Sequence, residues 1–127
     1  MGRRVLVVDD DRGIVDTLQT ILTMAGYDCA TSDNGNDALQ LAGHFDPHLV
    51  ISDVMMPGMS GVELALKLRN SHPRMRIILL SGHANTQDLL TQAGESLGTV
   101  LVLPKPYPPR ELLKLVAELT DTAHSAA

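Results

Sequence analysis

Residues 49–58 read LVISDVMMPG, so that an unbroken apolar run ends just before the carboxylate of Asp53. Residues 5–11 repeat the arrangement as VLVVDDD, where four apolar residues lead into three aspartates. Such apolar runs are typical of parallel strands buried on both faces of a sheet. Two of these strands would bring their carboxylates to one sheet edge, where ionised groups repel each other unless a cation neutralises them or their pKa values rise. The two stretches predict a metal site at the edge of an α/β sheet.

Short β-rich runs alternate with helical segments along the whole chain. We expect strands at Arg4–Asp9, Asp28–Ser32, His48–Asp53, Arg76–Ser81 and Thr99–Leu103. Apolar residues at helical spacing predict helices around Ile14–Ala25, Ala38–Phe45, Leu64–Leu68, Leu89–Leu97 and Leu112–Leu119. This alternation predicts a doubly wound parallel sheet with right-handed crossovers and helices on both faces.

Two local signals set the ends of these helices. Ser60 and Glu63 have the spacing of a capping box at a helix start, and Gly26 stands where a left-handed cap would end the first helix. The chain end from Thr122 to Ala127 is expected to fray.

The composition is that of one small globular domain. The 127 residues are 44% hydrophobic and 20% charged, which excludes a second sizeable domain and argues against disorder. The net charge of −5 argues against nucleic acid or an anionic membrane as the direct partner. No run approaches the roughly 18 apolar residues of a membrane span, and the run after Arg4 ends in aspartates, unlike a signal peptide. We therefore expect a cytoplasmic protein with no membrane partner.

The lone Cys29 excludes an internal disulfide, and we expect it to be a buried, inert thiol. The five histidines lack metal-ligand spacing, and the chain has no Gly-rich phosphate loop. These features exclude a zinc site and a nucleotide pocket of the usual kinds.

Four polar residues stand at or just after the ends of apolar strands, namely Asp9, Asp53, Ser81 and Lys105. In an open parallel sheet, ligands bind at the carboxyl ends of the strands, where the strand order reverses. The fold therefore predicts that these side chains converge on one site.

The same residues belong to four motifs that resemble, in order and spacing, those of the response-regulator receiver domains of two-component signalling. The motifs are VLVVDD at 5–10, SDVMMPGMSG at 52–61, LLSG at 79–82 and KPY at 105–107. The resemblance covers almost all of residues 1–127, with a core of about 4–120. It implies one receiver domain with a flavodoxin-like (βα)5 fold and strand order 2-1-3-4-5.

The resemblance also implies roles for the site residues. Asp53 would take a phosphoryl group from the phosphohistidine of a histidine kinase, and Lys105 and Ser81 would stabilise the charge on the transferring group. Mg2+ is the implied cofactor. Its implied ligands are Asp9, directly or through water, Asp10, Asp53 and the backbone carbonyl of Met55. A cis peptide before Pro106 is expected to aim Lys105 across the sheet edge.

Partners follow from the same resemblance. A sensor histidine kinase or a phosphotransfer protein would act upstream, and an effector protein would bind the face made by the fourth helix, fifth strand and fifth helix. Such a regulatory protein is no enzyme beyond catalysing its own phosphorylation and dephosphorylation. Many receivers carry an aromatic residue where this chain has Val102, so an aromatic switch is not expected here. His83 would either reach the pocket mouth or remain a solvated surface residue.

Other readings of these residues remain open. Asp11 is expected only to cap the first helix, and Asp9 and Asp10 could do the same. A pseudo-receiver that no longer accepts phosphate would keep the same fold. A small phosphatase of the haloacid-dehalogenase type would need its nucleophile motif in full after the first strand, where Asp9-Asp10-Asp11 here ends before Arg12-Gly13. A flavin site is disfavoured because the three carboxylates would repel the phosphate of the flavin. The chain is either a single-domain regulator or a receiver taken from a larger protein.

Overall fold

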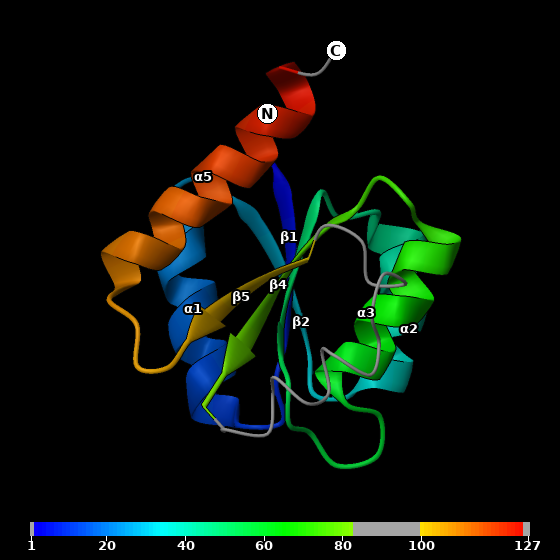
Figure 1. The fold of residues 1–127 in the computed structure, drawn as a ribbon. Coiled ribbons are helices and arrows are strands. Elements are labelled where there is room, and N and C mark those ends of the chain that lie inside the picture. The colour runs from blue at the N-terminus through cyan, green and yellow to red at the C-terminus, as the bar shows by residue number, and fades with distance from the viewer. Residues whose placement is uncertain (1, 83–99, 126–127) are drawn as a thin grey trace.

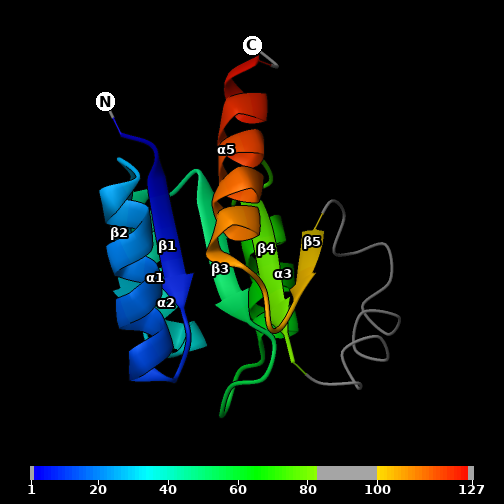
Figure 2. The same ribbon diagram turned by 90° about the vertical axis from the view of Figure 1, so that its left-hand side faces the viewer.

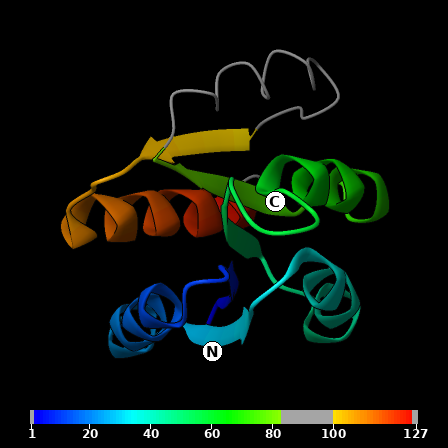
Figure 3. The same cartoon turned by 90° about the horizontal axis from the view of Figure 1, so that it is seen from below.

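The computed structural model describes residues 2–82 and 100–125, with side chains up to Thr120. Five parallel strands form one sheet in the order β2-β1-β3-β4-β5, which confirms the predicted topology. The strands are β1 Arg4–Val8, β2 Asp28–Ser32, β3 Leu49–Asp53, β4 Arg76–Ser81 and β5 Val100–Pro104. Helices α1 and α5 lie on one face of the sheet and α2 and α3 on the other (Figure 1; Figure 3).

Strand bounds differ from the predicted ones by a residue at some ends. The first strand stops at Val8 because the chain turns at Asp9 towards Asp11, the N-cap of α1. The Asp9 amide still donates to the Ser32 carbonyl. The third strand begins at Leu49 rather than His48, and β5 continues to Pro104. The expected helix around 89–97 and the predicted position of His83 lie outside the described residues.

The described helices are α1 Arg12–Met24, α2 Gly35–Phe45, α3 Gly61–Ser71 and α5 Pro109–Ser125. Asp11 caps α1, as predicted, and the Ser60 hydroxyl accepts a hydrogen bond from the Glu63 amide at the start of α3. Gly26 adopts a φ of +98° just after α1, a left-handed conformation that suits glycine. Helix α5 continues to Ser125, and neither proline nor glycine interrupts its last residues, while the fraying expected from Thr122 stays a prediction. No described helix combines the length and the apolar character that crossing a bilayer requires.

The core has two layers because successive strand side chains point to opposite faces of the sheet. In β1, Val5 and Val7 pack with the α1 and α5 side, whereas Leu6 and Val8 pack with the α2 and α3 side. Figure 1 shows the sheet edge-on between these layers, and Figure 2 shows it face-on with α1 and α5 towards the viewer. Strand β2 is only half-buried, as expected of an edge, while β3 is buried throughout. The polar residues of the predicted site thus lie at the carboxyl edge of a sheet whose central strands are buried.

Candidate functional site

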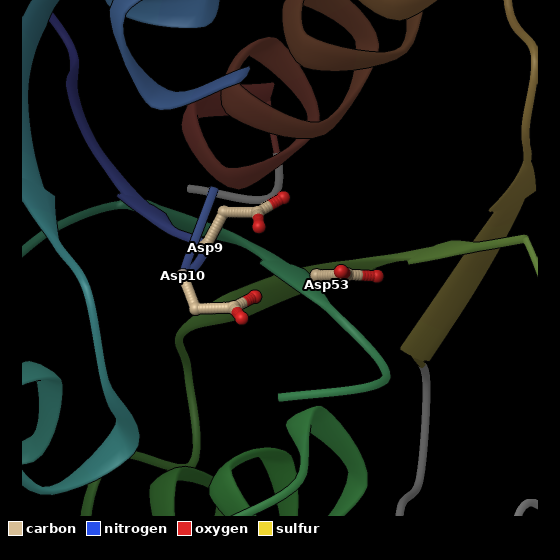
Figure 4. Close-up of side chains that lie close together, drawn as sticks. All are labelled: Asp9, Asp10 and Asp53. Atoms are coloured by element: carbon tan, nitrogen blue, oxygen red, sulfur yellow. The ribbon is translucent and has the colours of Figure 1, made fainter. Parts of the chain in front are cut away.

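Three carboxylates meet at the carboxyl edge of the sheet, as the sequence predicts. Asp53 ends β3, and Asp9 and Asp10 follow β1, which pairs with β3 in a register that sets Val8 opposite Ser52. One carboxylate oxygen from each aspartate lies within 4.8 Å of the other two (Figure 4). Asp9 and Asp53 are buried, whereas Asp10 is exposed. The cluster is therefore anchored in the core and open on one side.

Asp9 is the most constrained member of this cluster. The residue is 1% exposed. Its Oδ1 accepts a hydrogen bond of 2.9 Å from the Asp11 amide, and Oδ2 is buried without a hydrogen-bond partner among the described residues. Burial raises the pKa of Asp9 to about 6, and the nearby charge of Asp53 adds to this rise against the opposing Asp11 hydrogen bond. A buried carboxylate oxygen normally has a partner. The orphaned Oδ2 beside two further carboxylates fits a hard divalent cation, which prefers oxygen ligands.

Lys105 supplies a positive charge to the same edge. Its Nζ lies 3.3 Å from Asp53 Oδ1, with 26% of the lysine side chain and 12% of the aspartate side chain exposed. The Lys105 amide donates to the Ser81 carbonyl at 2.7 Å, and the peptide bond to Pro106 is cis, as predicted. The end of β5 is thus tied to the end of β4, which places a cation beside Asp53.

The other predicted site residues take the following places. Ser81 is half-buried at the end of β4, one residue beyond the Leu80 that pairs with Asp53. Met55 lies two residues beyond Asp53, and its side chain is 42% exposed. Its proposed role through the backbone carbonyl stays a prediction. Asp11 faces solvent and accepts hydrogen bonds from the Gly13 and Ile14 amides, which confirms it as a helix cap.

Sequence reasoning gave Gly61 no role of its own beyond its place in a motif. A Cβ atom at this position would overlap the Asp53 carbonyl oxygen, and the Gly61 amide donates to the Val54 carbonyl at 2.8 Å. The loop after Asp53 can therefore close onto the strand end only if a glycine starts α3. The signal in the sequence was a glycine placed directly after the capping Ser60.

Tyr107 is a second residue whose setting only the fold reveals. It is half-buried, and burial raises its pKa, with further contributions from the charges of Asp9 and Asp53. Tyr107 packs against the core layer of α1 and α5, whereas Val102 packs against the layer of α2 and α3. The two side chains thus serve opposite faces of the sheet, so Tyr107 does not take the place of an aromatic residue at 102.

Cys29 is half-buried, and burial raises the pKa of its thiol to about 11. The thiol therefore stays protonated at neutral pH, which agrees with the predicted inert role.

Comparisons with known proteins agree with this geometry. Residues 5–117 match the family model of the response regulator receiver domain. The chain is 34% identical over 127 residues to the alkaline phosphatase synthesis transcriptional regulatory protein PhoP of Bacillus subtilis, and it spans 52% of that protein.

Solved structures show the same likeness. A CheY-like receiver domain protein from Methanospirillum hungatei is 27% identical, with a TM-score of 0.92 and full coverage of both chains. The chemotaxis protein CheY4 of Vibrio cholerae is 30% identical, with a TM-score of 0.84 over 94% of this chain and 99% of that one. The signal receiver domain of an HD domain-containing protein from Pseudomonas fluorescens is 28% identical, with a TM-score of 0.89 over 98% of this chain and 91% of that one.

Proposed function

Because this chain belongs to the response regulator receiver domain family, we propose that it is the phosphoacceptor of a two-component phosphorelay and that Asp53 receives the phosphoryl group. The observation that carries the proposal is the Lys105 ammonium 3.3 Å from Asp53, beside the carboxylates of Asp9 and Asp10. Proteins of this family are typically regulatory rather than true enzymes. We therefore propose a role in signalling and not in metabolism.

The proposed reaction is a direct transfer to a carboxylate. An Asp53 oxygen attacks the phosphorus of a phosphohistidine, the P–N bond breaks, and the imidazole leaves with the bonding electron pair, so that an acyl phosphate remains on Asp53. Charge is spread over the equatorial oxygens of the transferring group, where the Lys105 ammonium and the Ser81 hydroxyl would stabilise it. The ion pair between Lys105 and Asp53 holds the ammonium close to the place where this charge develops.

Mg2+ is the proposed cofactor, held by Asp9, Asp10, Asp53 and the backbone carbonyl of Met55. When bound, it would supply positive charge that offsets carboxylate repulsion and the charge of the phosphoryl group. The buried and unpartnered Asp9 Oδ2 supports this assignment, because a cation would give that oxygen its missing interaction.

We propose one partner that acts before the phosphoryl transfer and one that acts after it. A sensor histidine kinase or a phosphotransfer protein would donate the phosphoryl group, and an effector protein would read the surface that includes β5 and α5. The tie between the Lys105 amide and the Ser81 carbonyl supports such a readout, since a change at the end of β4 would reach the end of β5. Position 102 on β5 is the half-buried Val102, so the proposed readout does not use an aromatic residue there.

The first test is phosphorylation by acetyl phosphate, followed by intact mass. The wild type should gain one phosphoryl group with Mg2+ and none with EDTA, and Asp53→Asn should gain none. Asp16→Asn is a matched control, because Asp16 is exposed on α1 and makes no ion pair with a described residue. This control should be phosphorylated like the wild type.

Three results would count against the proposal. Phosphorylation of Asp53→Asn would place the acceptor elsewhere. No gain of mass in the wild type together with no Mg2+ binding would favour a pseudo-receiver that binds partners without phosphate. Multiple turnover of a small phosphate ester would favour a phosphatase.

A further inference from the structure

Arg4 and Arg76 begin strands β1 and β4, at the edge of the sheet opposite to the aspartates, and Arg3 and Arg74 come just before these strands. His48 joins two of these strand ends, because its amide donates to the Arg4 carbonyl of β1 and its carbonyl accepts from the Arg76 amide of β4. Half of the ten Lys and Arg residues of the chain belong to this region, and all of these are arginines. We call them the arginine pole, and they are Arg3, Arg4, Arg69, Arg74 and Arg76.

A cavity of about 500 Å3 opens at the arginine pole, between the first residues of β1 and the segments that lead into β3 and β4. Pro47, Pro73 and Met75 give it an apolar wall, and Met75 is only 5% exposed. Arg4 and Arg74 also line the cavity. The site therefore offers an apolar recess next to guanidinium groups.

Most of the positive charge at the pole is not balanced by carboxylates. The one ion pair found there among the described residues joins Arg4 Nη2 to Asp46 Oδ2 at 3.7 Å, and both side chains are exposed. Within the same described part of the chain, the guanidinium groups of Arg3, Arg74 and Arg76 form no ion pair. The pole therefore carries excess positive charge on a protein whose net charge is −5.

His48 lines the cavity, and its pKa is lowered by burial and in part by the arginine charges. Burial lowers its pKa, and the charges of Arg4 and Arg3 lower it further, against the weaker pull of Asp46. The Arg4 amide donates a hydrogen bond of 3.0 Å to His48 Nδ1, so the neutral imidazole carries its proton on Nε2. At neutral pH the imidazole is therefore a neutral part of the wall, and the charge of the site comes from the arginines.

We propose that the arginine pole binds an acidic peptide segment of a partner protein, whose carboxylates contact Arg4 and Arg74 and whose neighbouring apolar side chain enters the cavity. Guanidinium groups are planar and donate two parallel hydrogen bonds to a carboxylate, which suits arginine better than lysine for this task. The surface lies at the opposite end of the strands from Asp53, so a bound peptide would not contact the proposed phosphorylation site.

Nucleic acid and anionic membranes fit the arginine pole less well. Asp46 lines the cavity and Asp28 stands opposite Arg4 in the register of β1 and β2, so a long polyanion would meet carboxylates at two points. Phe, Tyr and Trp are absent from the described residues that line the cavity, whose aromatic rings are the imidazoles of His48 and His72, so it offers no large ring for stacking bases. A short peptide with carboxylates beside apolar side chains avoids these conflicts.

The test uses a fluorescent peptide of alternating glutamate and leucine, with matched peptides in which serine replaces leucine or lysine replaces glutamate. Anisotropy titrations of the full chain should show binding of the first peptide and at least about tenfold weaker binding of each matched peptide. Arg74→Glu should weaken binding of the first peptide by a similar factor. Arg110→Glu makes the same charge change in the exposed first turn of α5 and should leave the affinity within about twofold.

Urea unfolding of both variants serves as a check of their folded state, which keeps this test separate from that of the proposed function. The proposal is overturned if the wild type does not bind the glutamate and leucine peptide, or if Arg110→Glu weakens binding as much as Arg74→Glu. Tighter binding of a single-stranded oligodeoxynucleotide, or of vesicles with anionic phospholipids, would overturn it in favour of those partners.

Discussion

Among single residues, Asp9 shows most directly what the site requires. Its buried Oδ2 has no hydrogen-bond partner among the described residues, and its pKa is raised to about 6. The folded, metal-free protein therefore bears a cost for keeping this carboxylate charged at neutral pH. The proposed metal site explains the presence of this destabilising carboxylate, because a bound cation would stabilise its charged form.

We expect Asp9→Asn to stabilise the metal-free protein at pH 7.5 by up to about 3 kcal/mol, because the amide keeps the shape of the side chain without its charge. Added Mg2+ should stabilise the wild type and have much less effect on the variant. Urea unfolding with Mg2+ and with EDTA measures both effects, and Asp16→Asn is the control that should change neither. A metal-free Asp9→Asn protein that is less stable than the wild type would contradict this account of Asp9.

Gly61 presents the opposite case, a residue required for its small size. We expect Gly61→Ala to cost about 1–3 kcal/mol and to slow the labelling of Asp53, because the new Cβ would displace the Asp53 carbonyl. Gly43→Ala is the control, since nothing lies within 4 Å of a Cβ there. This change in α2 should stabilise the protein by about 0.5–1 kcal/mol. Both values come from urea unfolding, and equal effects of the two changes would refute the close approach at Gly61.

Among the elements, α1 separates two uses of the aspartate triplet. Asp9 and Asp10 face Asp53, whereas Asp11 accepts hydrogen bonds from the first amides of α1 at 2.9 and 3.3 Å. A carboxylate at this place also interacts favourably with the positive end of the helix dipole. One short run of acidic residues thus serves both the proposed metal site and the start of a helix.

We expect Asp11→Ala to destabilise the protein by about 1 kcal/mol through loss of the α1 cap, and to leave the affinity for Mg2+ within about twofold. Asp10→Asn should show the reverse pattern, with weaker Mg2+ binding and little change in metal-free stability. Urea unfolding gives the stabilities, and Mg2+ titration by isothermal calorimetry gives the affinities. If Asp11→Ala weakened Mg2+ binding as much as Asp10→Asn, the two aspartates would share one role.

For the whole molecule, the main feature is the separation of charge between the two ends of the sheet. Carboxylates gather at the carboxyl edge and arginines at the opposite edge, so the two surfaces present fields of opposite sign. Each end can then attract a different kind of partner, and salt should weaken both attractions.

The stability of the metal-free protein should depend on pH through Asp9. Its pKa is about 6 in the folded state against a usual value of 3.8, so the folded state binds more protons between these values. The Asp9 contribution to stability is therefore greatest below pH 4 and is lost as the pH rises through 6. The total change is up to about 3 kcal/mol.

This dependence is measured as the difference in unfolding free energy between the wild type and Asp9→Asn over a pH series in EDTA, which cancels the contributions of other groups. Mg2+ should restore stability most strongly above pH 6, where the carboxylate is charged. A difference that does not vary between pH 4 and 7 would show that Asp9 titrates normally.

The amino-acid sequence was sufficient to predict the order of the strands, with the help of the family resemblance, and the meeting of Asp9, Asp10 and Asp53. Apolar runs and helical spacing are local signals, and parallel topology brings every strand end to a known edge. Three things needed the folded chain, namely the unpartnered Asp9 Oδ2, the tight fit of Gly61 under Asp53 and the assembly of the arginine pole from three separate segments. They depend on which atoms from distant segments come within a few ångströms and on how much water remains around them, and neither quantity is written in the pattern of any one segment.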